Sequence, residues 1–134
     1  MNVTKLVSSI DYALDTDVSL IRVSASEVRL TSDVIWTHVS AKPFPNLIIT
    51  DKIEAKNKIC TVELTFLTCQ SIPRHRRIVW KVGLTNGRYM LIGNGNRPYP
   101  IHKFTETMPD TPTDNQLLQV KVTYSMAGIL PYIR

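Results

Sequence analysis

Strict alternation of apolar and polar residues is the feature of this sequence that most constrains its fold. The alternation is clearest at 116–126 and recurs at 58–69. The apolar positions are Leu118, Val120, Val122, Tyr124 and Met126 in the first segment and Cys60, Val62, Leu64 and Phe66 in the second. Successive side chains of a strand point to opposite faces, so both segments are predicted to be strands with one buried and one exposed face. This pattern is typical of an antiparallel sheet.

Shorter stretches rich in β-branched residues predict further strands. They lie at 18–24, 27–30 and 34–39. Two more, at 77–84 and 88–92, flank an Asn-Gly pair and predict a β-hairpin. Asn-Gly favours a two-residue type I′ turn, because both central residues need a positive φ.

The predicted hairpin has two partly apolar faces. If Thr85 pairs with Arg88, Trp80 shares a face with Tyr89. The reverse face then holds Val79, Met90 and Ile92 beside Lys81 and Arg88. Because this reverse face is too apolar to be fully exposed, we expect either another segment of the chain or a partner to cover it.

The first 14 residues fit two patterns. Val3, Leu6, Val7, Ile10 and Leu14 have the spacing of a helical stripe. Several of the same residues also favour a strand. Of the two, a short N-terminal helix is the prediction.

An internal similarity suggests a duplicated unit. Segment 28–34 resembles 82–88, and each is followed by a basic-Pro-aromatic-Pro motif, at 42–45 and at 97–100. A loop and one long alternating strand follow each motif. A duplication would produce two pseudo-repeated three-stranded units packed face to face.

Length and composition agree with a single domain over residues 1–134. The chain is 43% hydrophobic and 20% charged, which is close to the globular average. No apolar run approaches the ~20 residues of a membrane helix, and the N-terminus has no continuous apolar region typical of a secretory signal. We therefore predict an all-β, mainly antiparallel fold, a small β-sandwich or barrel, in a cytoplasmic protein without a membrane partner.

Positive charge is concentrated in the middle of the chain. The net charge is +5, and residues 36–100 alone carry ten basic and three acidic side chains. Such a field attracts nucleic acid or an acidic protein, although a net charge of this size is also ordinary for solubility.

The predicted hairpin and the residues around it form the candidate interaction surface. Four residues, Arg74 to Arg77, open the hairpin, and further basic and apolar side chains follow along it. The full set is Arg74, His75, Arg76, Arg77, Val79, Lys81, Arg88, Met90 and Arg97. Basic residues interleaved with aromatic residues are used by grooves that bind single-stranded nucleic acid. A solvated or protein-binding face fits the same residues.

No motif for catalysis is present. The three histidines lack metal-ligand spacing, and Cys60 and Cys69 do not form a Cys-x-x-Cys motif. Cys60 is expected to be a small core residue, too far along the strand from Cys69 for a disulfide. A Cys69–His75 catalytic pair would lack a visible third orienting group. We therefore predict no enzyme activity, no catalytic or metal site, no cofactor and no small-molecule ligand.

A family resemblance adds a biological setting. Segment 78–93, the motif 97–100 and segment 120–124 resemble short uncharacterised proteins of gut Bacteroides-type bacteria and of their prophage-like elements. The resemblance covers less than half of the chain, has no diagnostic motif and carries over no functional residue. It implies a small β-rich component of virion assembly, of the neck or tail type, which would be virion-associated.

Three hypotheses for function follow. The first is a structural or interaction module that binds a protein partner or forms a homo-oligomer. The second is a nucleic-acid-binding β-barrel in which Arg74, Arg76 and Arg77 carry the binding. The third, an enzyme, has no named catalytic group.

Overall fold

The computed structural model is all-β. It describes residues 2–24, 26–31, 33–41, 45–70, 72–73, 76–93, 99–107, 117–128 and 130–133. The strands are β1 (Asn2–Leu14), β2 (Leu20–Arg22), β3 (Glu27–Leu30), β4 (Thr37–Val39), β5 (Asn46–Glu54), β6 (Asn57–Thr68), β7 (Ile78–Leu84), β8 (Tyr89–Ile92), β9 (Ile101–Thr107), β10 (Leu117–Ala127) and β11 (Tyr132–Ile133). A single 3₁₀ turn, η1 (Asp15–Asp17), follows β1.

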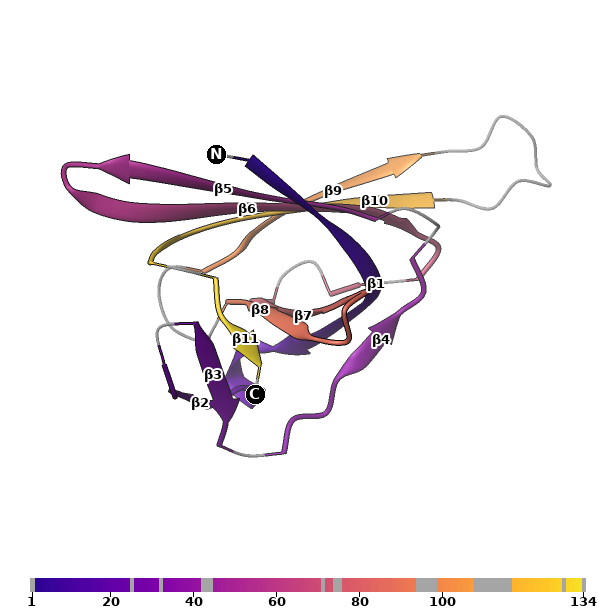
Figure 1. Cartoon of the computed structure of the whole chain (residues 1–134). Coiled ribbons are helices and arrows are strands. Elements are labelled where there is room, and N and C mark those ends of the chain that lie inside the picture. Colours follow the sequence, from indigo (N-terminus) through magenta and orange to yellow (C-terminus); the bar gives the residue numbers. More distant parts are fainter. Residues whose placement is uncertain are drawn as a thin grey trace, which may run out of the picture.

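All of these strands belong to one mostly antiparallel sheet that bends at β1. The strand order is β2-β3-β11-β8-β7-β1-β5-β6-β10-β9, and β4 pairs with β1 beside this path. The first residues of β1 pair with β5, and its later residues pair with β7 and β4. The register shifts by one residue between Val7 and Ser9, and such a bulge bends a strand. Figure 1 shows β1 running from the β5–β6–β10–β9 half to the β7–β8–β11–β3 half.

The larger apolar core joins these two halves. Its buried members include Ile10, Leu47, Val62, Leu64, Phe66, Ile78, Trp80, Val82, Met90, Ile92, Val120 and Val122. The Trp80 ring, from β7, lies 5.5 Å from the Phe66 ring of β6. The apolar positions of the two clearest alternating segments therefore point inward, as predicted.

A smaller core lies on the opposite face of β7. Val79 and Leu91 pack there with Ala13, Val18 and Val28. β7 is thus buried on both faces, and of its seven residues only Lys81 is partly exposed. The apolar reverse face of the hairpin is covered by the chain itself, one of the two possibilities that its composition raised.

The register of the β7–β8 hairpin differs from the predicted one. Gly83 pairs with Tyr89 and Val82 with Met90, which leaves the three residues 85–87 in the loop. The Leu84 N–H donates to the Arg88 carbonyl at 2.9 Å, and only Gly87 in the loop has a positive φ, 84°. A three-residue loop ending in left-handed glycine replaces the type I′ turn. The shift of one residue moves Met90 to the Trp80 face and Tyr89 to the opposite face.

The predicted N-terminal helix is wrong, because residues 2–14 form β1. Ile10 and Ala13 are buried, whereas Leu6, a member of the proposed helical stripe, is 71% exposed. The ladders to β5, β7 and β4 satisfy the backbone of β1 from three different strands. Tertiary pairing therefore overrides the local helical spacing.

The duplicated units are not reflected in the strand pairing. The predicted strands at 27–30 and 34–39, which would belong to one of these units, do not pair with each other: β3 pairs with β2 and β11, and β4 pairs with β1. The two long strands β6 and β10 are direct neighbours rather than parts of separate units. Because β1 joins both halves in one open sheet, the structure is neither two separate sheets nor a closed barrel. Residues 42–44 and 97–98 of the repeated motifs lie outside the described residues.

Among the described residues, no helix has the length and apolar character needed to span a membrane.

Candidate functional site

The predicted interaction surface is divided between the two ends of β7. Arg76 and Arg77 are exposed just before β7, and the Arg77 guanidinium lies 4.0 Å from the centre of the Tyr99 ring. Arg88 lies beyond the hairpin loop, opposite the far end of β7. Seven strand residues between them correspond to about 23 Å. Arg74, His75 and Arg97 lie outside the described residues.

Lys81 forms contacts within the protein. Its Nζ lies 3.6 Å from a carboxylate oxygen of Asp11 on the neighbouring strand β1. It also lies 4.9 Å from the Trp36 ring centre and 5.0 Å from the Tyr89 ring centre. The opposite side of Asp11 contacts His38 of β4 at 3.0 Å. These polar contacts join β4, β1 and β7, and they cover the margin of the smaller core.

Arg88 has a similar structural role. Its guanidinium lies 3.2 Å from a Glu27 carboxylate oxygen and 3.9 Å from the centre of the Tyr132 ring. Glu27 begins β3 and Tyr132 begins β11, so Arg88 fastens the hairpin to both strands. A basic side chain held flat on a ring and paired with a carboxylate presents less free charge to a partner.

Val79 and Met90 do not contribute to the candidate surface, because both side chains are buried. They are 1% and 3% exposed, and they belong to the smaller and the larger core respectively. Neither side chain can contact a partner while this fold is intact. The physical reasons differ: Val79 lies on the face of β7 that packs against Val18 and Val28, whereas the one-residue register shift places Met90 on the Trp80 face, inside the larger core.

A partly buried polar pair lies beside the larger core and was not predicted. The Trp80 Nε1–H donates to the Nε2 of His102 at 2.8 Å, and the His102 ring also stacks with Phe104. Burial lowers the pKa of His102 to about 4. The imidazole is therefore neutral at pH 7 and acts as a hydrogen-bond acceptor for Trp80.

One edge of the sheet is formed by β9, and β2 forms the other. β10 is the partner of β9 in the ladder, and β9 stands at the end of the strand order. Ile101 pairs with Thr123 on the face opposite to the core and is 71% exposed. The other outward side chains of this strand, Lys103 and Thr105, are also exposed. The sequence did not predict β9, because its apolar and polar residues do not alternate strictly. The apolar Ile101 faces outward, whereas the inner face begins with the polar residue His102.

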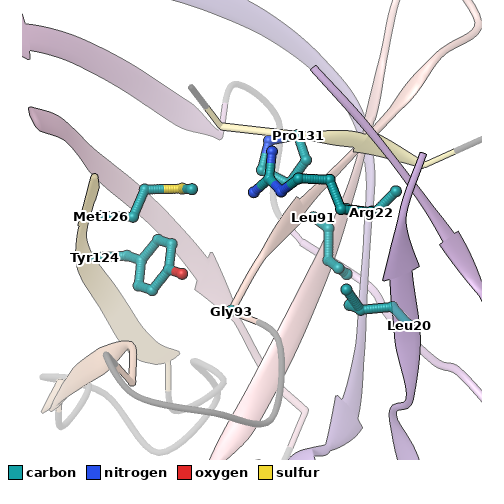
Figure 2. A pocket seen from close by; sticks show the side chains of 8 residues that line it. Leu20, Arg22, Leu91, Gly93, Tyr124, Met126 and Pro131 are labelled. Carbon is teal, nitrogen blue, oxygen red and sulfur yellow. The ribbon is translucent and has the colours of Figure 1, made fainter. Parts of the chain in front are cut away.

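A pocket of about 220 Å³ opens where the two halves of the sheet diverge. Its walls come from β2, β3, β8 and β10 and from Gly93 and Pro131 (Figure 2). Leu20, Val28, Leu91 and Met126 supply apolar surface, and Arg22 and Tyr124 supply polar groups. Burial raises the pKa of the Tyr124 phenol, and the positive charge of Arg22 partly opposes this effect. The phenol is therefore protonated at neutral pH and can donate a hydrogen bond.

The cysteines are separate and free. Cys60 is buried, as predicted, and Cys69 is exposed. Burial raises the pKa of the Cys60 thiol, which disfavours the reactive thiolate. His75, the suggested partner of Cys69, lies outside the described residues. Among the residues that are described, no three His, Cys, Asp or Glu side chains gather where they could hold a metal ion.

Comparisons with protein-family models, with curated proteins and with solved structures give no match.

Proposed function

We propose that the protein is a non-catalytic interaction module that self-associates through the edge of strand β9. The observation that carries this proposal is an edge strand of seven residues, with Ile101 71% exposed at its start. The partner is a second copy of the same chain, paired antiparallel to β9.

The backbone of β9 supports strand addition. The ladder to β10 uses one side of the strand, and an edge strand presents its other row of N–H and C=O groups for pairing. Natural proteins protect long edges with bulges, prolines or charges. Within Ile101–Thr107 the described ladder is regular, there is no proline, and Lys103 supplies a charge on the outer face.

The surface next to this edge has suitable chemistry for a protein contact. On the outward face, Ile101 lies beside Thr123 of β10, and Thr123 lies beside Glu63 of β6. Leu67 on the same face is 38% exposed. Mixed apolar and polar side chains on a flat sheet are compatible with burial against a second sheet edge, in which the backbone supplies most hydrogen bonds.

Virion assembly in a prophage-like element is the setting that we propose, following the resemblance in sequence. A component of such an assembly acts by repeated contacts between copies, and a symmetric pair is the simplest closed arrangement.

Nucleic-acid binding is the less favoured function. Lys81 and Arg88 form ion pairs with Asp11 and Glu27, respectively, so among the described basic residues of the candidate surface only Arg76 and Arg77 are exposed without an ion pair. A groove for nucleic acid along the hairpin would therefore have much less free positive charge than the sequence suggests.

Light scattering coupled to size-exclusion chromatography tests the proposal. The wild-type protein is expected to form a dimer whose fraction rises with concentration, and Ile101→Lys is expected to give a monomer. The matched control is Ile35→Lys, because Ile35 is 89% exposed outside the β9 edge. A monomeric mass for the wild type at every concentration would overturn self-association, and equal effects of both substitutions would exclude β9 as the contact. Salt-sensitive binding to oligonucleotides that is lost in Arg76→Ala would favour the alternative.

A further inference from the structure

The pocket between β2, β8 and β10 contains an unused hydrogen-bonding group. Tyr124 is only 3% exposed, and its hydroxyl makes no hydrogen bond with another described residue. No inaccessible side-chain nitrogen or oxygen in the described part of the chain lacks a partner. The Tyr124 oxygen must therefore be reached through accessible space, and Figure 2 shows this side chain at the pocket wall.

A cationic group borders the same pocket. Arg22, at the end of β2, is exposed as a residue, and Figure 2 shows its guanidinium beside Pro131 at the pocket. Its Nη1 also lies 3.5 Å from the Ser24 carbonyl oxygen, which places the side chain along the β2–β3 connection. A guanidinium has five N–H donors, so it can keep such a contact and still bind an anion.

The remaining walls favour a compact apolar group. Leu20, Leu91 and Met126 line the pocket, and the volume of about 220 Å³ exceeds the roughly 150 Å³ of an engineered cavity that accepts benzene. An apolar lining with a few polar groups is typical of small-molecule sites. One cation and one neutral donor suit a singly charged anion better than a highly charged phosphate.

We propose that this pocket binds a small monocarboxylate that carries a short aliphatic or aromatic group. The carboxylate accepts hydrogen bonds from Arg22 and Tyr124, and the apolar group lies between Leu20, Leu91 and Met126. This assignment departs from the prediction of no small-molecule ligand, and it is independent of the proposed contact at β9.

Methyl NMR of the full chain tests the proposal at pH 7. The protein is labelled with ¹³C at the methionine methyl groups and titrated with isobutyrate, hexanoate and benzoate, with benzamide as the neutral analogue of benzoate. Binding is expected to move the Met126 signal in a saturable manner. Met90 provides an internal reference, because it is buried in the larger core and does not line the pocket.

Three variants identify the groups that bind the carboxylate. Arg22→Gln is expected to weaken the affinity about tenfold or more, since a hydrogen bond to a charged group contributes about 1.5–3 kcal/mol. Tyr124→Phe is also expected to weaken it about tenfold or more, because the hydroxyl donates to the same charged carboxylate. Arg29→Gln is the control: Arg29 is an exposed arginine of the adjacent strand β3 that does not line the pocket, and the affinity should not change.

Three results would overturn the proposal. They are the absence of a saturable Met126 shift with all three carboxylates, equal affinity for benzoate and benzamide, and an equal loss of affinity in Arg22→Gln and Arg29→Gln.

Discussion

The partly buried His102 is expected to make the stability of this protein depend on pH. Its Nε2 accepts a hydrogen bond from Trp80, and this requires the unprotonated form of that nitrogen. Burial lowers its pKa to about 4 in the folded protein, whereas a histidine in an unfolded chain titrates near pH 6.5. The informative substitution is His102→Gln, because glutamine offers an acceptor for the Trp80 N–H and does not titrate.

The sign of the effect follows from which state binds the proton first. As pH falls below 6.5, the unfolded chain becomes protonated at His102 while the folded protein does not, so the free energy of unfolding decreases. The decrease continues until the pH reaches the folded pKa of about 4, and it is absent above pH 6.5. The difference between the two pKa values corresponds to about 3 kcal/mol. Because the ring is partly exposed, screening by solvent reduces the expected loss to about 2 kcal/mol.

Urea unfolding followed by circular dichroism between pH 7.5 and pH 4 measures this loss. Carboxylates also titrate toward the lower end of the range, so the relevant quantity is the difference between the wild-type and His102→Gln curves. We expect the wild-type protein to lose about 2 kcal/mol more than the variant over this range. Parallel curves for the two proteins would refute the assignment of His102 as a neutral buried acceptor.

Three further variants test the fold. Ala55→Asn combined with Lys56→Gly should raise the free energy of unfolding by about 1 kcal/mol in urea, because Ala55 and Lys56 have positive φ values of 48° and 68° in the β5–β6 turn. Val79→Lys should cost more than about 4 kcal/mol and give an unfolded circular dichroism spectrum, whereas a folded monomer would show that Val79 lies at an interface. Thr68→Val should lower the melting midpoint at a cost of about 1–3 kcal/mol, because the buried Thr68 hydroxyl donates to the Ser40 carbonyl at 2.9 Å; an unchanged midpoint would contradict this.

Strands with strict alternation were predictable because burial of one face is encoded locally. Segments 58–69 and 116–126 correspond to β6 and β10 within one residue at each end, and 27–30 corresponds to β3. In each case the inward positions are apolar, so the pattern predicts both that the segment is a strand and which of its faces is buried. The all-β class could therefore be predicted without knowledge of the strand order.

Other elements depend on distant residues and were missed. β5 was not predicted as a strand, because its turn to β6 has Ala55 and Lys56 in left-handed conformations that usually favour glycine or asparagine. β1 was interpreted as a helix, because its pairing with β5, β7 and β4 is not visible in residues 2–14 alone. The β7–β8 register differed because Gly87 closes a three-residue loop, and Asn-Gly is compatible with both loop lengths.

The candidate surface was harder to predict than the fold. Among its described members, Arg76 and Arg77 are exposed, whereas Val79 and Met90 are buried. The single register shift accounts for the position of Met90, since it exchanges the two faces of β8. The pocket at Arg22 and Tyr124 had no signal in the sequence, because its walls come from strands that are distant along the chain.

The basic and aromatic residues around the hairpin have a structural explanation in this fold. A strand buried on both faces needs a cover on each, and on the face of the smaller core β7 is partly exposed at Lys81. Lys81 lies over Trp36 and Tyr89, and Arg88 lies over Tyr132, so their stems and charges close this margin while their carboxylate partners hold them in place. The same interleaving in the sequence is typical of nucleic-acid grooves, where the rings must be free to stack on bases. The two roles therefore differ in whether the rings already contact a cation of the same protein, and among the described residues the rings of Trp36, Tyr89, Tyr99 and Tyr132 do.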